Sequence, residues 1–259
     1  MATLRKRVLE ALYPDPDLPY RRALLSAAGP RTRALEIGAG SGAGTQIYSP
    51  LRGVVGCLIG IDVDPAVGTN PHLDMGVVAD ASRLPFPDES FDLVFHRTVA
   101  EHFEEPASAI KECARVLRPG GKLVFLTPNR WYYPMIVARL TPTWFHRFWI
   151  GHVLHRRADH EIFPTFYRAN TRRTIATLLR HAGLSGRISM LRTRPGYLAF
   201  FLPVMLLGIA WEQAIERFVP ALRGRLLVEA TRPNGRPARD HPDTTSFEHA
   251  GRAGPPPSQ

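Results

Sequence analysis

Hydrophobic residues of this chain gather in short runs of strand length, and segments with helical spacing separate these runs. A run that is apolar throughout indicates a strand buried on both faces, and its alternation with helices indicates a doubly wound α/β sheet. The chain therefore predicts one α/β domain. Strands are expected at 34–38, 57–64, 76–80, 91–96, 122–128, 186–191 and 226–232, and helices at 107–117 and 171–184.

Four segments do not follow this alternation. Residues 1–32 are expected to form a helical extension, which leaves 33–232 as the main domain. Residues 129–170 are dense in Trp, Tyr, Phe, His and Pro and too long for a simple connection, so they predict an inserted cap. An apolar helical insertion is expected at 197–218. The tail 233–259 is rich in Pro, Gly, Arg and Asp and is expected to be disordered, because it cannot bury enough apolar surface.

The insertion begins with a mostly apolar run, 197–210, that contains Pro203. This run is shorter than the ~20 residues that a helix needs to cross a bilayer. Two interpretations fit it equally well. It is either a core helix or homodimer contact, or a surface that touches a membrane or a lipid-like acceptor.

The charge of the chain is strongly basic. It has 33 Lys and Arg against 23 Asp and Glu, a net charge of +10, and almost all of the basic residues are arginine. Arginine pairs bidentately with anionic groups, which favours nucleic acid, a phosphorylated substrate or an acidic membrane face. A simple preference for arginine explains the excess equally well. The first thirty residues lack a secretory apolar stretch, so a cytoplasmic location is expected, with peripheral contact at the inner face of the membrane as an option.

A glycine-rich turn is the first sign of ligand chemistry. ALEIGAGSGAG (34–44) places Gly38, Gly40 and Gly42 between a predicted strand and a helix, where the bare backbone turns tightly and approaches a ligand. The same turn fits the dinucleotide pattern G-x-G-x-x-A, so a nicotinamide enzyme has to be considered. Asp62 ends the next strand, where a carboxylate accepts hydrogen bonds from both hydroxyls of a ribose. These features indicate nucleoside binding without selecting one cofactor.

Three later segments make that selection. They are ADASRLPF (79–86), SFDLVFHRTVAEHF (90–103) and RVLRPGGKLVF (115–125). In their order and spacing after the glycine turn and Asp62, they resemble the class I S-adenosylmethionine-dependent methyltransferases, in particular the type 11 group that includes the quinone-biosynthesis methylases. The resemblance covers roughly residues 33 to 128. It implies a Rossmann-like, seven-stranded, mostly parallel sheet with S-adenosyl-L-methionine as the cofactor.

The resemblance also implies roles for individual residues. The first strand and glycine turn would hold the methionine end of the cofactor, and the carboxylates after the next two strands would hold its ribose and adenine. The end of the fourth strand would face the sulfonium and the acceptor. In that order, these residues are Glu36, Gly38, Gly40 and Gly42, then Asp62, then Asp80 and Ala81, then His96 and Arg97.

Other chemistries lack their characteristic residues. No tyrosine has a lysine four positions later, as reductases of this general fold commonly do, and there is no GxxxxGK[ST] phosphate loop. FHRTVAEH (95–102) lacks the Asn/Asp-Pro-Pro-aromatic turn of amino-nitrogen base methylases. Cys57 and Cys113 form no CxxC and are expected to be packing residues rather than the nucleophile of a cytosine methylase.

A hydroxyl acceptor would benefit from a general base, most often a histidine. His102 follows the fourth strand and either supports the helix start or serves as this base. The cap offers a second set, of which His160 is the preferred base: His152, His155, Asp159, His160, Glu161 and Tyr167. The spacing of His152, His155 and Asp159 also suits a divalent metal, but arginines beside them favour solvated side chains, and no metal site is expected.

The aromatic residues of the cap form either a lid over the acceptor or an ordinary core. They are Trp131, Tyr132, Tyr133, Trp144, Phe145, Phe148 and Trp149. The favoured hypothesis is an O-methyltransferase that acts on a small or lipid-linked acceptor, such as a sugar hydroxyl, a phenol or a polyprenyl-type head group. Methylation of a quinone-ring carbon, RNA methylation by the basic surface and a non-catalytic cofactor-binding module stay open as alternatives.

Overall fold

The computed structural model describes residues 2–13, 15–42, 51–140, 164–195, 198 and 201–234. Its helices and strands follow one another in this order: α1 (Ala2–Leu12), α2 (Leu18–Ala27), β1 (Arg33–Ile37), β2 (Cys57–Asp62), β3 (Met75–Val78), β4 (Phe91–Arg97), α3 (Pro106–Val116), β5 (Leu117–Pro128), α4 (Tyr133–Leu140), α6 (Arg172–His181), β6 (Ser185–Leu191), α7 (Leu202–Phe218) and β7 (Arg225–Thr231). Short 3-10 turns lie at Pro65–Thr69, Ala100–His102 and Pro220–Leu222.

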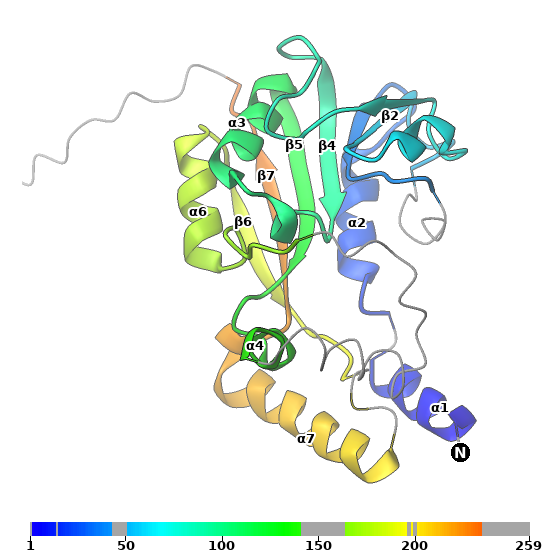
Figure 1. Cartoon of the computed structure of the whole chain (residues 1–259), viewed down its shortest axis with the longest axis vertical. Coiled ribbons are helices and arrows are strands. Elements are labelled where there is room, and N and C mark those ends of the chain that lie inside the picture. The colour runs from blue at the N-terminus through cyan, green and yellow to red at the C-terminus, as the bar shows by residue number, and fades with distance from the viewer. Residues whose placement is uncertain are drawn as a thin grey trace, which may run out of the picture.

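The strands form one seven-stranded sheet in the order β3-β2-β1-β4-β5-β7-β6 (Figure 1). The pairs among β1 to β5 are parallel, and β7 runs antiparallel to both β5 and β6. The chain adds β2 and β3 on one side of β1 and then returns to add β4 and β5 on the other. In open α/β sheets a ligand binds at such a reversal, beyond the carboxyl ends of the strands. The fold therefore directs attention to the ends of β1, β2 and β4.

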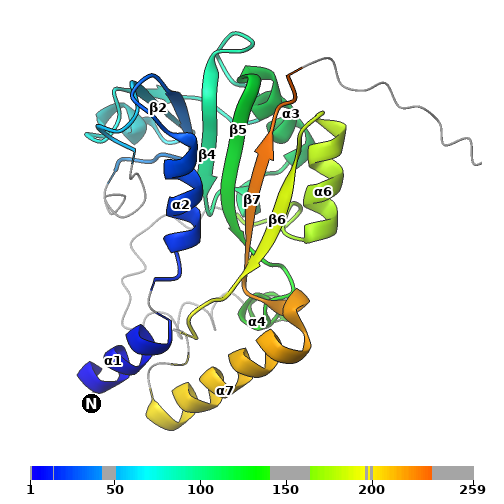
Figure 2. The ribbon, with the colours of Figure 1, turned by 180° about the vertical axis from the view of Figure 1, so that it is seen from behind.

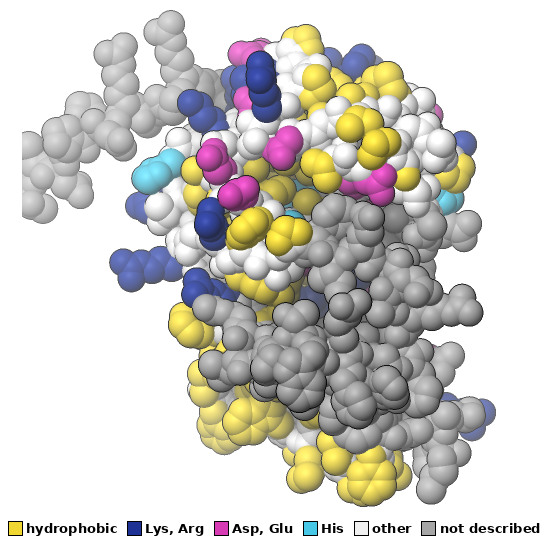
Figure 3. Space-filling model, viewed as in Figure 1, with side chains coloured by type: hydrophobic (Ala, Val, Ile, Leu, Met, Phe, Trp, Pro, Cys, Tyr) yellow, Lys and Arg dark blue, Asp and Glu magenta, His cyan; other side chains and the backbone are white. Residues whose placement is uncertain are grey.

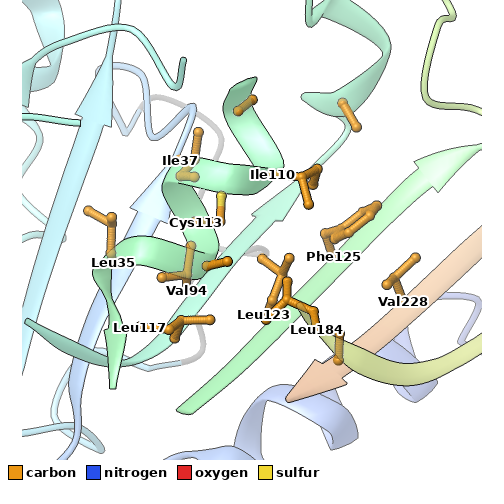
Figure 4. Close-up of a cluster of buried hydrophobic side chains, with 14 of the residues drawn as sticks. Leu35, Ile37, Val94, Ile110, Cys113, Leu117, Leu123, Phe125, Leu184 and Val228 are labelled. Carbon is orange, nitrogen blue, oxygen red and sulfur yellow. The ribbon is translucent and has the colours of Figure 1, made fainter. Parts of the chain in front are cut away.

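Both faces of the sheet are covered, as the continuous apolar runs predicted. The helix α2 lies on one face, and α3 and α6 lie on the other (Figures 1 and 2). Because successive strand residues point to opposite faces, Leu35 and Ile37 of β1 join the cluster under α3, whereas Ala34 joins the cluster under α2. Figure 4 shows the first cluster, in which Cys113 lies among these apolar side chains.

Several predicted boundaries are displaced by a few residues. The third strand ends at Val78 and not at residue 80, so Asp80 lies in the turn beyond it. The fifth strand begins earlier than residue 122, because α3 ends at Val116 and β5 begins at Leu117, so residues 118–121 belong to β5. The stretch is accommodated by a shift of register between β4 and β5 and by Gly120, whose φ of 80° lets the strand bend.

A second layer of structure lies beyond the carboxyl edge of the sheet. There α7 crosses below the strands and packs against α1 through Leu9, Tyr13, Met205 and Ile209 (Figures 1 and 2). Asn129, which directly follows β5, donates two side-chain hydrogen bonds to the backbone after α7, of 3.0 and 2.8 Å. The backbone that follows α7 is therefore bonded directly to the edge at which a ligand is expected.

Candidate functional site

A cavity of about 620 Å³ opens at the carboxyl ends of β1 and β2. Its described lining comes from Ile37 and Gly38, from Ile61 to Val63, from the turn 79–82, from Thr98, Val99, 102–105 and Ala109, and from Pro164 and Phe166. The cavity therefore lies where the strand order reverses. It brings together Gly38, Asp62, Asp80, Ala81 and His102, five of the residues selected from the sequence.

The glycine turn has the backbone geometry that its sequence predicted. Gly38 has a φ of 72°, a conformation that favours glycine, and a Cβ there would lie 2.4 Å from Cγ2 of Val99. Val99 lines the same cavity. The missing side chain thus lets the turn after β1 approach the segment after β4.

Asn70 holds this turn and was not anticipated. Its buried side-chain amide donates hydrogen bonds of 3.0 Å to the Ala39 carbonyl and 3.1 Å to the Gly40 carbonyl. Gly42 also depends on it, since a Cβ at Gly42 would lie 2.5 Å from the Asn70 Oδ1. No periodic pattern marks this residue, because it acts on backbone atoms about thirty positions away.

Asp62, at the end of β2, holds the turn from the other side. Its Oδ2 accepts a hydrogen bond of 2.8 Å from the Gly40 amide, and its Oδ1 accepts one of 3.0 Å from the Asp64 amide. A carboxylate oxygen accepts two hydrogen bonds, so each oxygen keeps acceptor capacity for a further donor. A pair of ribose hydroxyls supplies such donors.

The turn after β3 supplies the third element of this wall. Asp80 Oδ1 accepts a hydrogen bond of 2.6 Å from the Ser82 amide, which fixes its side chain beside Ala81. Asp80, Ala81 and Ser82 all line the cavity. The carboxylate of Asp80 is exposed, and its second oxygen is an acceptor that suits a donor such as an exocyclic amine.

The opposite wall combines one histidine with apolar groups. His102 Nδ1 lies 2.9 Å from the carbonyl oxygen of Pro164, so in the neutral ring Nδ1 carries the proton that is donated. The other nitrogen, Nε2, then carries the lone pair. Val99, Phe103 and Phe166 line the cavity around it.

The electrostatic character of the cavity is opposite to that of the chain. Its described lining contains the carboxylates of Asp62, Asp80, Glu104 and Glu105 and no lysine or arginine. Such a lining attracts a cation, and the attraction is moderated by the solvent that reaches Glu104 and Glu105. The arginine excess of the sequence is therefore not concentrated around the described lining.

His96 does not face the cavity, contrary to expectation. It is fully buried, with its ring stacked on Phe125 at 4.5 Å between centroids and in edge contact with Phe103. Burial lowers the pKa of His96 to about 3, so the ring is neutral at physiological pH. The reason lies in the pleat, since His96 points to the same face as Val94, beneath α3. The assignment of His96 to cofactor contact or catalysis is thus not supported.

Arg97 also serves the fold rather than the cavity. Its guanidinium pairs with Asp17 at 2.9 Å, and Asp17 pairs in addition with Arg225 of β7. Neither Arg97 nor Glu36 belongs to the described lining. Glu36 lies on the α2 face of β1, where its charge contributes to the raised pKa of the buried Tyr20. Gly40 and Gly42 shape the turn without lining the cavity.

The predicted lid aromatics that the structure describes, Trp131, Tyr132 and Tyr133, do not line the cavity. Trp131 is exposed, and the buried Tyr132 donates a hydrogen bond of 2.8 Å to Glu212 of α7. Tyr133 packs against Tyr132, and the Tyr167 hydroxyl lies 3.2 Å from the sulfur of Met135. The remaining candidates lie outside the described residues: Trp144, Phe145, Phe148, Trp149, His152, His155, Asp159, His160 and Glu161. Among the described residues, no cluster of three His, Cys, Asp or Glu side chains suits a metal.

Comparison with known proteins agrees with this fold and cavity. Residues 35–125 match the model of a methyltransferase domain. A Mycolicibacterium smegmatis protein named "Probable S-adenosylmethionine-dependent methyltransferase" is 35% identical over 119 residues, which cover 44% of each chain. The ubiquinone/menaquinone biosynthesis C-methyltransferase UbiE of Pseudomonas savastanoi is 34% identical over 119 residues, or 41% of this chain and 46% of UbiE. The matches therefore span less than half the length of these relatives.

Solved structures are similar in fold at low sequence identity. An S-adenosylmethionine-dependent methyltransferase of Mesorhizobium loti has a TM-score of 0.52 at 18% identity, over 84% of this chain and 98% of that one. The geranyl diphosphate C-methyltransferase of Streptomyces coelicolor has a TM-score of 0.53 at 16% identity, over 88% and 83%. The matched segment, residues 35–125, is thus similar to the class I S-adenosylmethionine-dependent methyltransferases of the type 11 group, and the sheet order and the glycine turn with its two carboxylates agree with this similarity.

Proposed function

We propose that the chain binds S-adenosylmethionine in this cavity and transfers its methyl group to a small or lipid-linked acceptor. The observation that carries the proposal is the meeting of Gly38, Asp62 and Asp80 on one cavity at the reversal of strand order. The acidic lining supports it further, because the cofactor is a sulfonium cation. When bound, S-adenosylmethionine supplies an already activated methyl group.

The residues of the cavity would divide the binding between them. The remaining acceptor capacity of Asp62 suits the ribose hydroxyls, and Asp80 with Ala81 suits the adenine edge. The apolar side chains of Val99, Phe103 and Phe166 would exclude water from the reacting groups. In-line transfer needs this alignment more than covalent help from the protein.

We favour O-methylation, with His102 as the general base. The hydrogen bond to Pro164 fixes the tautomer that leaves Nε2 basic, and His102 lines the cavity. A hydroxyl placed against this nitrogen would lose its proton as its oxygen attacks. The apolar groups on the same wall suit a phenol or the head of a lipid-linked acceptor. His160 stays a prediction, because it lies outside the described residues.

Methylation of a ring carbon is the second candidate. Similarity to a quinone-biosynthesis C-methyltransferase favours it. His102 would serve here too, since removal of a phenolic proton makes the adjacent ring carbon nucleophilic. The two reactions differ in the bond that is formed and not in the base.

Transfer of labelled methyl from S-adenosylmethionine into a cell extract tests these proposals. Extraction into organic solvent shows whether the product is lipid-linked, and hot hydriodic acid releases the label from an O-methyl ether but not from a C-methyl group. Label in an acid-resistant product would support ring methylation. Binding without any transfer would favour a cofactor-binding module, and no binding of S-adenosylmethionine by calorimetry would overturn the proposal.

A further inference from the structure

The helix α7 carries apolar side chains on two sides. One side, with Met205 and Ile209, is buried against the protein. The opposite side is exposed: Leu206 is 50%, Leu207 72%, Trp211 54% and Phe218 79% accessible. Exposed apolar residues that occur singly are ordinary on protein surfaces, but a row of them on one helix is not. We call the row Pro203, Leu206, Leu207, Ala210, Trp211 and Phe218 the α7 apolar face.

Helical spacing makes these residues one continuous surface. Positions three and four apart lie on the same side of a helix, and the face follows this spacing from Pro203 to Trp211, with Phe218 two turns further on. It extends over about 22 Å at 1.5 Å per residue. Figure 3 shows apolar side chains gathered at the end of the molecule where α7 lies.

The charges of α7 leave this face free of carboxylates. Glu212 is buried and accepts the hydrogen bond of Tyr132, and Glu216 pairs with Arg192 at 2.9 Å. Burial raises the pKa of Glu212. The exposed charged residue of α7 is Arg217, close to Phe218 at one end of the face. The face is thus apolar, with one exposed arginine at its end.

We propose that the α7 apolar face docks on an anionic lipid bilayer. An interfacial helix buries its apolar side at the boundary of head groups and acyl chains, and basic residues at its border bind anionic lipids. Tryptophan is favoured at this depth. None of the described helices has the length and apolar continuity needed to span a bilayer, so docking would be peripheral.

A second copy of the chain fits the face less well. The net charge of +10 makes two copies repel each other, whereas it attracts an anionic surface. A helix of this length and about 10 Å width presents on the order of 250 Å², well below the roughly 800 Å² per partner of a stable protein interface.

Docking would also orient the cavity. Both α7 and the cavity lie at the carboxyl edge of the parallel strands, and Asn129 and Tyr132 bond α7 and the backbone after it to the segment that follows β5. A chain held by α7 would therefore turn this edge toward the lipid. Docking itself does not depend on methyl transfer; only the delivery of a lipid-linked acceptor rests on the proposed function.

Sedimentation with extruded vesicles tests the docking. We expect the full chain to bind phosphatidylcholine vesicles that contain phosphatidylglycerol, more weakly at high salt, and to bind pure phosphatidylcholine little. Leu207→Glu and Trp211→Glu should each lower the partition coefficient about tenfold or more. Leu25→Glu is the matched control, because Leu25 is 46% exposed near the end of α2 that leads into the start of β1, at the opposite edge of the sheet, and should bind as the wild type does.

Three results would overturn the docking proposal. They are no binding to either vesicle, equal loss in Leu25→Glu, and a concentration-dependent dimer that Leu207→Glu dissociates. Thermal unfolding and S-adenosylmethionine binding by each variant verify that it is folded. They also separate this proposal from the catalytic one, since a chain that binds vesicles but not the cofactor would refute only the latter.

Discussion

Replacing Asp62 by Asn tests the cofactor end of the cavity most directly. The two side chains have nearly the same size, but Asn offers one oxygen and one NH2 group where Asp offers two oxygens. In the protein both oxygens accept backbone hydrogen bonds, from Gly40 and Asp64. The NH2 group of the new side chain would point at one of these amides, which is itself a donor, so one bond is lost whichever way the side chain turns.

The expected loss of affinity follows from these bonds. A hydrogen bond to a charged group contributes about 1.5–3 kcal/mol, and a neutral one about half of that. Asp62→Asn removes the charge from the bonds to the ribose and replaces one acceptor by a donor. We expect a loss of about 2–4 kcal/mol in the binding of S-adenosylmethionine, or roughly 30-fold to 1000-fold in Kd. The free protein should lose about 1.5–3 kcal/mol of unfolding free energy, because one of the two backbone bonds to the carboxylate is lost.

Isothermal titration with S-adenosylmethionine and thermal unfolding measure the two effects. Asp64→Asn is the matched control, because Asp64 caps the 3-10 turn through the Ala66 amide, does not line the cavity, and Asn caps equally well. It should change Kd by less than about threefold. Wild-type affinity in Asp62→Asn, or an equal loss in Asp64→Asn, would refute the assignment of the ribose to Asp62.

Three further predictions concern catalysis, pH and stability. His102→Asn retains a donor for the Pro164 carbonyl but provides no base, so turnover should fall by a factor of about 10²–10⁴ while cofactor affinity stays nearly unchanged. Wild-type turnover in this variant would mean that His102 only supports the fold. Burial raises the pKa of Glu101, so the folded chain keeps a proton that the unfolded chain releases above 4.5. The stabilisation is complete below that pH and is lost as pH rises through the folded pKa. In denaturant titrations, Glu101→Gln should remove this decline of unfolding free energy with pH. The same pH profile in the variant and the wild type would contradict the prediction. Asp17→Ala leaves the partly buried Arg97 and Arg225 without their carboxylate and should cost about 3 kcal/mol of unfolding free energy, whereas a loss below about 1 kcal/mol would mean that water replaces it.

The parts of the site that follow strand ends were predictable from sequence. The glycine turn follows the first strand, and a carboxylate follows each of the next two strands. Because parallel strands end at one edge of the sheet, the sequence alone places these groups together. The cavity accordingly joins Gly38, Asp62 and Asp80. The sheet face to which His96 points was also predictable, because His96 and the apolar Val94 are two residues apart in β4 and therefore point to the same face. Its position near the end of a strand was wrongly given more weight than the direction of its side chain.

Other parts carry no local signal. Asn70 acts on backbone carbonyls some thirty residues earlier, and Pro164 and Phe166 reach the cavity from the far side of the predicted cap. Their roles depend on how distant segments meet, and the hydrophobic pattern does not encode this. Glu104 and Glu105 directly precede α3, and only the cavity shows that they also line its wall.

The carboxylate of Asp17 has a consequence for the order of folding. It joins the start of α2 to Arg97 in the middle of the chain and to Arg225 at a separation of 208 residues. Contacts this distant form late, because closing a long loop costs entropy before any contact compensates for it. During synthesis, the ion pair between Asp17 of the α2 start and Arg225 therefore forms only after β7 has left the ribosome. A chain that ended before Arg225 would keep Arg97 as the only one of these two arginines beside Asp17, and we expect its α2 helix to open more readily to proteases and hydrogen exchange.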